Sequence, residues 1–359
     1  MGRGSNGLAI GACAVIVCLL IITGVVVGIV LGLKAQKGHA KPDVNPTTTL
    51  IPHTMVTGGR NIGTLKSTEL YDPSRNTWEK ARDMIDTRAW HVASLLENGK
   101  LLVTGGSSYG LVLATAELYD PSINVWKSIR NMTRARQYHT VSVLETGLVL
   151  VTGGWDGNAL NTAELYNPLT GSWLMIKAMR YHRYHHTAIT LSNGKVLVIG
   201  GKDNAALNSC ELYDPLTGSW TIGPSLAGPR YKHTASVLRD GKVLVAGGMS
   251  NSIVLSSVEL YDPMKGTWAM SAPMSIGRYE HTASVVKTGM VLVTGGLDSY
   301  EHLINAELYD PIGNVWVPTG NMSHLRYGHA ASVIGDGQVL ITGGHDLAVL
   351  RSAELYNPL

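Results

Sequence analysis

The chain has 359 residues, of which 45% are apolar and 15% charged, and its formal net charge is +3. This length suits one large domain with an appendage. Four of the 29 basic residues flank the first apolar run, and without them 25 basic residues stand against 26 acidic ones. The rest of the chain is near −1, so it offers no basic domain to nucleic acid.

The amino-terminal part predicts a membrane anchor. A polar tail, residues 1–7, precedes a run of 26 residues without a charge, residues 8–33. About 20 apolar residues span a bilayer, so this run predicts one transmembrane helix with some tilt. The apolar core of a cleaved signal peptide has roughly 7–15 residues, which is shorter. We therefore expect a single-pass membrane protein in which a polar linker, residues 34–43, follows the helix.

Two signals disagree on which side of the membrane the remainder lies. Lys34, Lys37 and Lys41 follow the apolar run, and basic flanks favour the cytoplasmic side. Asn131 and Asn321 begin Asn-x-Thr/Ser motifs, which are glycosylation candidates outside the cytoplasm. The sequence leaves the side open.

Residues 44–359 consist of a unit that recurs every 47 or 48 residues. A Gly-Gly pair begins at Gly58, Gly105, Gly153, Gly200, Gly247, Gly295 and Gly343. A Glu-Leu-Tyr triplet begins at Glu69, Glu117, Glu164, Glu211, Glu259, Glu307 and Glu354. An Arg-x-x-His motif opens the unit at Arg88, Arg136, Arg183, Arg230, Arg278 and Arg326. Such a period indicates a propeller or a solenoid.

The unit from Arg230 to Trp268 predicts four antiparallel strands, here called a to d. A short strand a, His-Thr-Ala-Ser-Val-Leu, meets Asp240-Gly241, a signal for a two-residue hairpin. The apolar strand b, Lys-Val-Leu-Val-Ala, suits a strand covered on both faces. Strand c ends in Tyr-Asp-Pro, where proline stops the ladder, and the Trp lies on strand d. Four strands without a helix predict a propeller blade.

The Gly-Gly, Glu-Leu-Tyr-Asp-Pro and Trp elements closely resemble the kelch repeat. The resemblance covers residues 44–359 and implies an all-β propeller with strand a innermost, around a central channel. Strands b and c occur seven times, which predicts seven blades; six blades with a surplus unit is the alternative. The first strand a is expected at residues 44–51, and the last unit has no strand d, so a strand at residues 47–50 is a candidate for closing the ring.

Residues that recur in every unit are interpreted as architecture. Sites with a function usually break such symmetry, so the six recurring arginines favour a structural role over contact with an acidic ligand. Cys210, in a slot where other units have small residues, is interpreted as a buried structural thiol. The His-rich stretch at residues 181–186 lacks nearby Cys or carboxylate ligands, so we predict no metal site and no cofactor.

The variable loops between strands b and c predict the binding face. Loops on a rigid scaffold carry function, and Trp, Tyr and Arg dominate binding energy. The candidate ligand-binding residues are Arg60, Tyr109, Trp155 and Tyr300 in these loops, with Arg183 and Tyr184 before strand a, Trp155 being the strongest.

We therefore expect a non-catalytic scaffold that binds a protein or a glycan, with no catalytic residues. The alternative that the resemblance leaves open is a carbohydrate-active enzyme, similar either to galactose oxidase or to the sugar epimerases built on kelch propellers.

Overall fold

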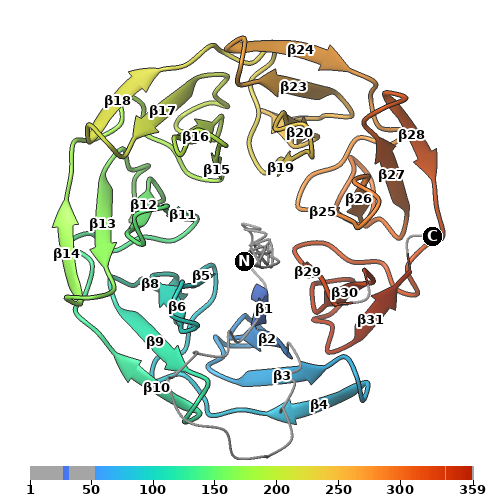
Figure 1. Ribbon diagram of the computed structural model, residues 1–359. Coiled ribbons are helices and arrows are strands. Elements are labelled where there is room, and N and C mark those ends of the chain that lie inside the picture. Colours follow the sequence, from blue (N-terminus) through green and yellow to red (C-terminus); the bar gives the residue numbers. More distant parts are fainter. Residues whose placement is uncertain (1–26, 32–52, 336, 358–359) are drawn as a thin grey trace, which may run out of the picture.

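Each repeat folds into one antiparallel sheet, and seven such sheets surround a central opening (Figure 1). The computed structural model describes residues 27–31, 53–335 and 337–357. The innermost strands of neighbouring blades contact one another around the opening, including β1 with β5 and with β29. The prediction of an all-β propeller is confirmed, with seven blades rather than six.

The blades follow one another in chain order. From the inside outwards, blades 1 to 3 contain β1 (Val27–Leu31), β2 (His53–Thr57), β3 (Thr68–Asp72) and β4 (Thr77–Lys80); β5 (Val92–Leu95), β6 (Leu101–Thr104), β9 (Ala116–Asp120) and β10 (Val125–Ser128); and β11 (Thr140–Val143), β12 (Val149–Thr152), β13 (Ala163–Asn167) and β14 (Ser172–Met175). Blades 4 and 5 contain β15 (Thr187–Thr190), β16 (Val196–Ile199), β17 (Cys210–Asp214) and β18 (Ser219–Ile222); and β19 (Thr234–Val237), β20 (Val243–Ala246), β23 (Val258–Asp262) and β24 (Thr267–Ser271). Blades 6 and 7 contain β25 (Thr282–Val285), β26 (Val291–Thr294), β27 (Ala306–Asp310) and β28 (Val315–Pro318); and β29 (Ala330–Val333), β30 (Val339–Thr342) and β31 (Ala353–Tyr356). Two small hairpins, β7 (Ser107–Ser108) with β8 (Leu111–Val112) and β21 (Met249–Ser250) with β22 (Ile253–Val254), lie in loops between strands b and c.

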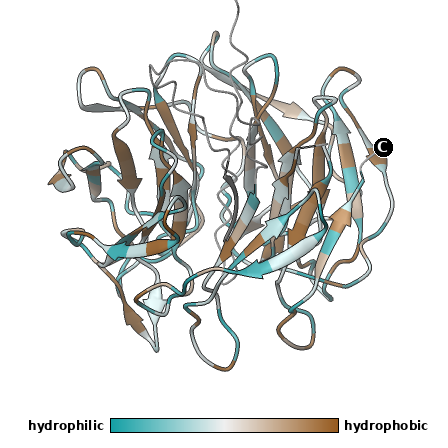
Figure 2. Cartoon of the chain, turned by 60° about the horizontal axis from the view of Figure 1, so that its bottom comes forward, coloured by the Kyte–Doolittle hydropathy of each residue, from teal (hydrophilic) through white to brown (hydrophobic). Residues whose placement is uncertain are grey.

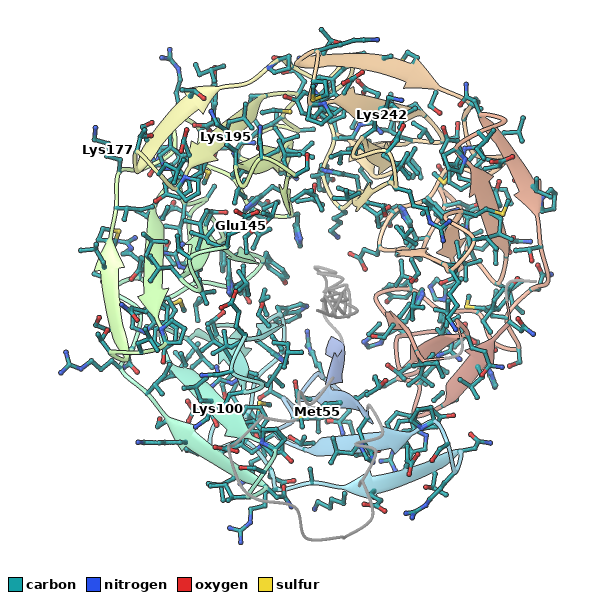
Figure 3. The ribbon with its side chains drawn as sticks, viewed as in Figure 1. Met55, Lys100, Glu145, Lys177, Lys195 and Lys242 are labelled. Carbon is teal, nitrogen blue, oxygen red and sulfur yellow. The ribbon has the colours of Figure 1, made fainter. Side chains whose placement is uncertain are left out.

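The hydrophobic core lies between neighbouring blades. One cluster joins Leu150 and Ala163 of blade 3 to Val196, Val198 and Tyr213 of blade 4. The equivalent cluster between blades 1 and 2 contains Met55, which Figure 3 labels. Figure 2 shows hydrophobic residues along the strands of the blades. Strand b contributes most because its apolar residues are covered on both faces of the sheet, as their continuous run predicts.

The recurring Arg and Glu form a buried ion pair inside each of blades 2 to 6, with Nη2–Oε1 distances of 2.6 to 2.9 Å. In blade 5, for example, Arg230 donates from Nη2 to Glu259 and from Nη1 to the carbonyl of Gly247, at 3.0 Å. Arg326 pairs with Glu354 in blade 7. The arginine therefore ties strand c to the Gly-Gly turn of its own blade. Glu69 of blade 1, whose unit lacks this arginine, is exposed.

The recurring His and Trp connect one blade to the next. His233 of blade 5 shares a hydrogen bond of 2.9 Å between Nε2 and the hydroxyl of Thr187 in blade 4. Trp220 of blade 4 donates from Nε1 to the carbonyl of Lys177, which leads out of blade 3, at 2.8 Å. The same contacts repeat around the ring, so the invariant residues hold the blades together.

The antiparallel order gives the propeller two different faces. The turns from strand a to b and from c to d lie at one end of each blade, which we call the turn face. The loops from b to c and the segments from d to the next a lie at the other end, the mouth face. The candidate binding loops and the Arg-x-x-His segments are therefore on the same face, as the kelch resemblance implies.

Blade 1 differs from the sequence prediction in its innermost strand. Val27–Leu31 form β1 and pair with β2, from Val27 opposite Thr57 to Leu31 opposite His53. These five residues belong to the run 8–33 for which a transmembrane helix was expected, and here they form a strand; a β-branched apolar segment suits the inner place of a blade. Residues 8–26 and 32–33, and the strands expected at residues 44–51, lie outside the described residues. Among the described residues, none forms a helix long and apolar enough to cross a membrane.

Candidate functional site

The two residues between Arg and His of each motif lie at the mouth of the central opening. The first of them pairs its backbone with the residue that follows the Gly-Gly turn, as Tyr231 does with Met249. The second has a left-handed backbone in all six motifs, with φ between 53° and 57°. We call these second residues the mouth ring: Trp90, Tyr138, His185, Lys232, Glu280 and Gly328.

Backbone hydrogen bonds join the mouth ring from blade to blade. From Tyr138 onwards, each N–H donates to the carbonyl of the previous member, at 3.4 Å from Tyr138 to Trp90 and 2.9 Å from Gly328 to Glu280. The remaining links measure 3.1 to 3.4 Å. The backbone is thus nearly the same at six positions. A left-handed conformation is uncommon for residues such as Trp and Tyr, and here it recurs where side chains meet the opening.

The side chains of the mouth ring differ at every position. Three aromatic members follow one another, with ring centroids 5.5 Å apart between Trp90 and Tyr138 and 4.1 Å between Tyr138 and His185. Tyr184 and Tyr231, which directly follow the Arg of their motifs, continue these contacts, with ring centroids 5.0 and 6.5 Å from that of His185. Blades 2 to 5 therefore present a continuous aromatic arc.

Charged groups lie at the two ends of this arc and beside it. Lys232 and Glu280, adjacent members of the ring, form an ion pair. The guanidinium of Arg60 lies 5.3 Å from the ring centroid of Trp90, and the ammonium of Lys202 lies 5.1 Å from that of Tyr231. The described mouth thus combines an aromatic arc, three cations and one carboxylate, a mixture typical of recognition sites.

Electrostatic effects show that these groups converge from several blades. Burial, and then the Glu280 carboxylate from blade 6, raise the pKa of Tyr138 at blade 3. Burial and the Arg60 guanidinium of blade 1 lower the pKa of His345 in blade 7. Burial, followed by the Lys232 ammonium, holds the pKa of His185 well below its ordinary value. His185 is therefore a neutral ring at neutral pH.

The loop residues predicted from the sequence lie around this mouth. Tyr109 and Tyr300 are 75% and 95% exposed at the tips of their loops. Trp155 is half-buried, and its backbone pairs with Gln137, the first variable residue of the neighbouring motif. Arg60 and Tyr184 belong to the mouth itself. The structure therefore places five of the six predicted residues on one face.

Arg183 does not fit a role in binding. Its side chain is 0% exposed, and it donates to Glu211 at 2.9 Å and to the carbonyl of Gly200 at 2.6 Å. The structural alternative described for the recurring arginines accounts for it. In this motif it is Tyr184 and His185, the two residues after the arginine, that lie at the mouth.

Other sequence interpretations concern residues outside the mouth ring. Cys210 is buried in blade 4, and burial raises the pKa of its thiol to about 12, as an inert structural thiol requires. Within the part of the chain that the structure describes, no three His, Cys, Asp or Glu side chains are placed to hold a metal ion. Asn131 and Asn321 are exposed between strands, where glycosylation is sterically feasible.

Comparison with known proteins identifies the repeats. Residues 177–344 match the KLHDC2/KLHL20/DRC7 Kelch-repeats domain, and residues 98–133 and 135–180 match the Kelch motif. None of the curated proteins compared with the chain matches it. Together with the fold, these matches define the chain as a seven-bladed β-propeller. It belongs to the kelch-repeat proteins.

A solved structure shares this fold. A fungal alcohol oxidase of the AA5 family, described as having catalytic diversity and as being in complex with copper, is similar with a TM-score of 0.72. The similarity covers 94% of this chain and 75% of the oxidase at 19% sequence identity. At this identity the likeness concerns the fold alone.

Sequence reasoning missed most of the mouth ring. Trp90, Tyr138, Lys232 and Glu280 were absent from the predicted site because the invariant Arg and His around them dominate the motif. A signal was present: the residue just before His differs in all six motifs, whereas Arg and His stay constant. What the sequence did not show is that these positions face the central opening.

Proposed function

We propose that the chain is a non-catalytic scaffold that binds a protein or a glycan at the mouth face, with the mouth ring at the centre of the site and the loops from b to c around it. One observation carries the proposal: six positions with the same backbone conformation, joined by five backbone hydrogen bonds, have six different residues. Architecture does not require this variety, whereas recognition of an asymmetric ligand does.

The chemistry of the mouth supports recognition. Aromatic rings such as Trp90 and Tyr138 bury large areas and stack on planar or sugar surfaces. Arg60 and Lys202 supply cations beside this arc, and Trp155 and Tyr300 extend it outwards on the loops. The Arg, Glu and His residues that an epimerase would employ are instead buried, paired and repeated in blade after blade.

The likeness to the copper alcohol oxidase does not lead us to propose oxidase activity. Cys210 is buried within blade 4, and the described residues contain no cluster of metal ligands. The residues present do not fit a copper centre.

The test is to screen the protein against a displayed peptide library and a glycan array, together with two variants. Trp90→Ala with Tyr138→Ala removes the middle of the aromatic arc, and Trp155→Ala with Tyr300→Ala removes the loop anchors. The control is Leu169→Ser, an exposed change on the turn face. We expect ligands that bind the natural protein and the control and that are lost from at least the Trp90/Tyr138 variant. Ligands that bind all four proteins equally would place the binding site elsewhere.

We further propose that residues 8–26 and their flanks attach the protein to a membrane, as the uncharged run favours. Carbonate extraction of cell membranes should leave the protein in the pellet, and its release into the supernatant would contradict attachment.

A second experiment determines on which side of the membrane the propeller lies. If it lies outside, glycosidase treatment should change the electrophoretic mobility of the natural protein but not that of the variant Asn131→Gln with Asn321→Gln. Full protection from protease in sealed vesicles without such a change would place it inside.

A further inference from the structure

The turns from strand a to strand b carry a second set of variable residues, at the end of the opening opposite the mouth. In each turn the N–H of the glycine donates to the carbonyl three residues before it, at 2.9 to 3.0 Å, so the turns are alike. The first residue between this donor and acceptor is exposed and differs from blade to blade. In blades 2 to 6 we call these residues the turn ring: Glu97, Glu145, Ser192, Arg239 and Lys287.

The charges of the turn ring are separated into two halves. Blades 2 and 3 carry the two carboxylates, blade 4 carries the neutral Ser192, and blades 5 and 6 carry the two cations. Each charged side chain reaches towards the next turn: the carboxylate of Glu97 lies 3.4 Å from the Cβ position of Gly147, and the guanidinium of Arg239 donates to the carbonyl of Lys287. Like charges are therefore neighbours, which costs free energy in a single molecule.

The four charges of the turn ring have no counter-ion of their own. Within the part of the chain that the structure describes, none of them takes part in an ion pair. The lysines that follow the turns of blades 2, 4 and 5 are different, because each pairs with a carboxylate of its own blade at 2.7 to 3.1 Å: Lys100 with Asp120, Lys195 with Asp214 and Lys242 with Asp240. Figure 3 labels Glu145 near the central opening. The turn ring thus presents unpaired acidic and basic halves on one face.

A second copy of the chain carries the charges that complement both halves. When two turn faces meet, a twofold axis that lies in the plane of contact and passes through blade 4 places blade 3 of one copy over blade 5 of the other, and blade 2 over blade 6. Glu145 of each copy then faces Arg239 of the other, and Glu97 faces Lys287. Ser192 lies at the axis, where identical residues meet and where a charge would face itself. The order of charges around the ring is therefore self-complementary.

The turns from strand c to strand d fit the same axis. Leu169, Leu216 and Met264, which occupy one turn position in blades 3 to 5, are 95%, 89% and 93% exposed. An axis through blade 4 places Leu216 against its own copy and Leu169 against Met264, so that apolar side chains meet apolar ones. Contact between two copies would remove this surface from water.

We propose that two copies of the chain associate by their turn faces around this twofold axis, through ion pairs between the turn rings and through the apolar residues of blades 3 to 5. Blades 2 to 6 supply the contact; residues 32–52, which join β1 to β2, lie outside the described residues. The partner leaves both mouth faces uncovered, and the proposal is independent of the mouth site.

The start of β1 lies at the end of the propeller opposite this contact. Val27 pairs with Thr57, which precedes a Gly-Gly turn, so the chain enters β1 from the mouth face. Two copies joined by their turn faces therefore have their amino-terminal sides in opposite directions. Where the proposed membrane attachment holds each copy, the two copies belong to facing membranes.

The test reverses the charge of each half of the turn ring in turn. The full chain is purified in detergent, and sedimentation velocity follows its association over a range of protein concentrations. Glu97→Lys with Glu145→Lys makes the ring wholly basic, and Arg239→Glu with Lys287→Glu makes it wholly acidic. Because the apolar run at residues 8–33 could itself associate, the comparison between variants decides, and not association alone.

The matched control reverses two charges away from the turn ring. Lys127→Glu with Lys177→Glu changes the net charge as much as the acidic variant does, at exposed positions of the outer rim, where Figure 3 labels Lys177. We expect the natural protein and the control to form dimers. Each reversed variant should need about tenfold or more protein to reach the same dimer fraction, since its like charges face each other. Melting temperatures check that every variant folds.

Mixing the two reversed variants gives the sharpest expectation. In an equimolar mixture a wholly basic ring meets a wholly acidic one, so dimers should form again, and differently tagged copies should purify together. Added salt should weaken the natural dimer, because it screens the exposed charges.

A short bis-maleimide cross-linker tests the position of the axis. Cys13 and Cys18 are changed to Ser, while Cys210 is buried and stays. Ser192→Cys should link two copies, because this residue lies at the axis. Thr288→Cys, exposed in the turn of blade 6, should not, because its own equivalent in the second copy lies across the opening.

Four outcomes would overturn the proposal. A natural protein that stays monomeric at every concentration would exclude the contact. Equal association of the natural protein, the control and both reversed variants would show that the copies associate elsewhere. Loss of dimers in both reversed variants without recovery in their mixture would show that the two halves do not face each other. Equal cross-linking at positions 192 and 288 would contradict an axis through blade 4.

Discussion

The four residues of the Arg-x-x-His segment fall into two regions, one constant and one variable from motif to motif. Its ends, such as Arg230 and His233, are the same in six motifs, buried, and bonded to the same partners. Its middle changes from motif to motif: the second middle position, Lys232 in this motif, has the same left-handed backbone in all six motifs but a different residue in each, and the first is Tyr in four of the six. We call the first set the frame and the second the mouth. The comparison shows that, in this repeat, the residues that stabilise the fold and the residues proposed to bind a ligand are different ones, although they lie only one or two positions apart in the sequence.

The largest effect is expected where the frame is broken at its ion pair. Glu259 is buried and accepts from Arg230 at 2.8 Å and from the N–H of Ala227 at 2.8 Å. Glu259→Ala leaves a buried guanidinium without its carboxylate, and should lower the free energy of unfolding by about 3–5 kcal/mol. Denaturant titration measures this. The comparison variant is Glu280→Ala in the mouth, where Lys232 remains half-exposed; an equal loss there would refute the separation.

The Gly-Gly turn offers a test with a matched control. Gly247 has φ 64°, and a Cβ there would lie 2.5 Å from the carbonyl oxygen of Arg278 in the next blade. Gly266 has φ 65° with no atom near its Cβ position. Gly266→Ala should cost about 1 kcal/mol for its backbone conformation, whereas Gly247→Ala should cost about 2–4 kcal/mol because the blades must also separate. Equal melting temperatures would show that the close approach between blades is unimportant.

Removal of a Trp weakens a single contact between blades. The ring of Trp220 lies 5.0 Å from that of Tyr213 and its Nε1 donates to Lys177, but part of the ring is exposed. Trp220→Ala should therefore cost about 2–3 kcal/mol, less than the loss of a fully buried ring. Trp220→Phe, which keeps the ring contact and removes the donor, should cost about 1 kcal/mol. The midpoints of denaturant unfolding distinguish the contribution of the ring contact from that of the hydrogen bond to Lys177. Unchanged midpoints in both variants would show that Trp220 does not hold the two blades together.

The histidines of the frame predict that acid destabilises the propeller. Burial, and then the Arg230 guanidinium, lower the pKa of His233 to about 3, from 6.5. Between these values the unfolded chain binds the proton and the folded chain does not, so stability falls as pH drops from about 6.5 towards 3. His91 and His329 behave in the same way. Each contributes up to about 1.4 kcal/mol per pH unit, so His233→Gln should reduce the slope by that amount. Unfolding curves from pH 7 to pH 4 measure it, and an unchanged slope would contradict a neutral buried His233.

The frame could be predicted from the sequence to a large extent, because it repeats. The period, the Gly-Gly turns and the continuous apolar strand b are enough by themselves to indicate a four-stranded blade. The partner of the recurring Glu could not be chosen, since Arg and His both recur at fixed spacing and only the packing decides that Arg reaches strand c. The innermost strand of blade 1 was missed because Val27–Leu31 are apolar and β-branched within a run whose length favours a membrane span.

The mouth could be predicted only in its outer part. Exposed loop residues such as Tyr300 follow from variation and residue type. The mouth ring requires knowing that the residue before His has a left-handed backbone and faces the opening, and no single motif shows this. Arg183 was included among the candidates for the converse reason: it lies at the mouth in the sequence, but its side chain turns into the blade.

The smallest effect on stability is expected in the mouth ring, together with the largest effect on binding. Tyr138 packs against His185 at 4.1 Å between ring centroids and lies near the Glu280 carboxylate. Tyr138→Phe keeps the ring and removes the hydroxyl, and should change the free energy of unfolding by less than about 0.5 kcal/mol. Gly328→Asn places a side chain where the ring has none, in a backbone conformation that Asn adopts readily. Both variants should fold normally and alter the set of peptides or glycans that bind, because they change what a ligand meets while every bond of the frame persists. Melting temperatures check the folding of the variants, and array profiles measured on the same preparations check their binding. If a variant melts normally and keeps the natural binding profile, its position is not part of the binding site. If either variant fails to fold, the mouth ring is needed for stability and belongs to the frame.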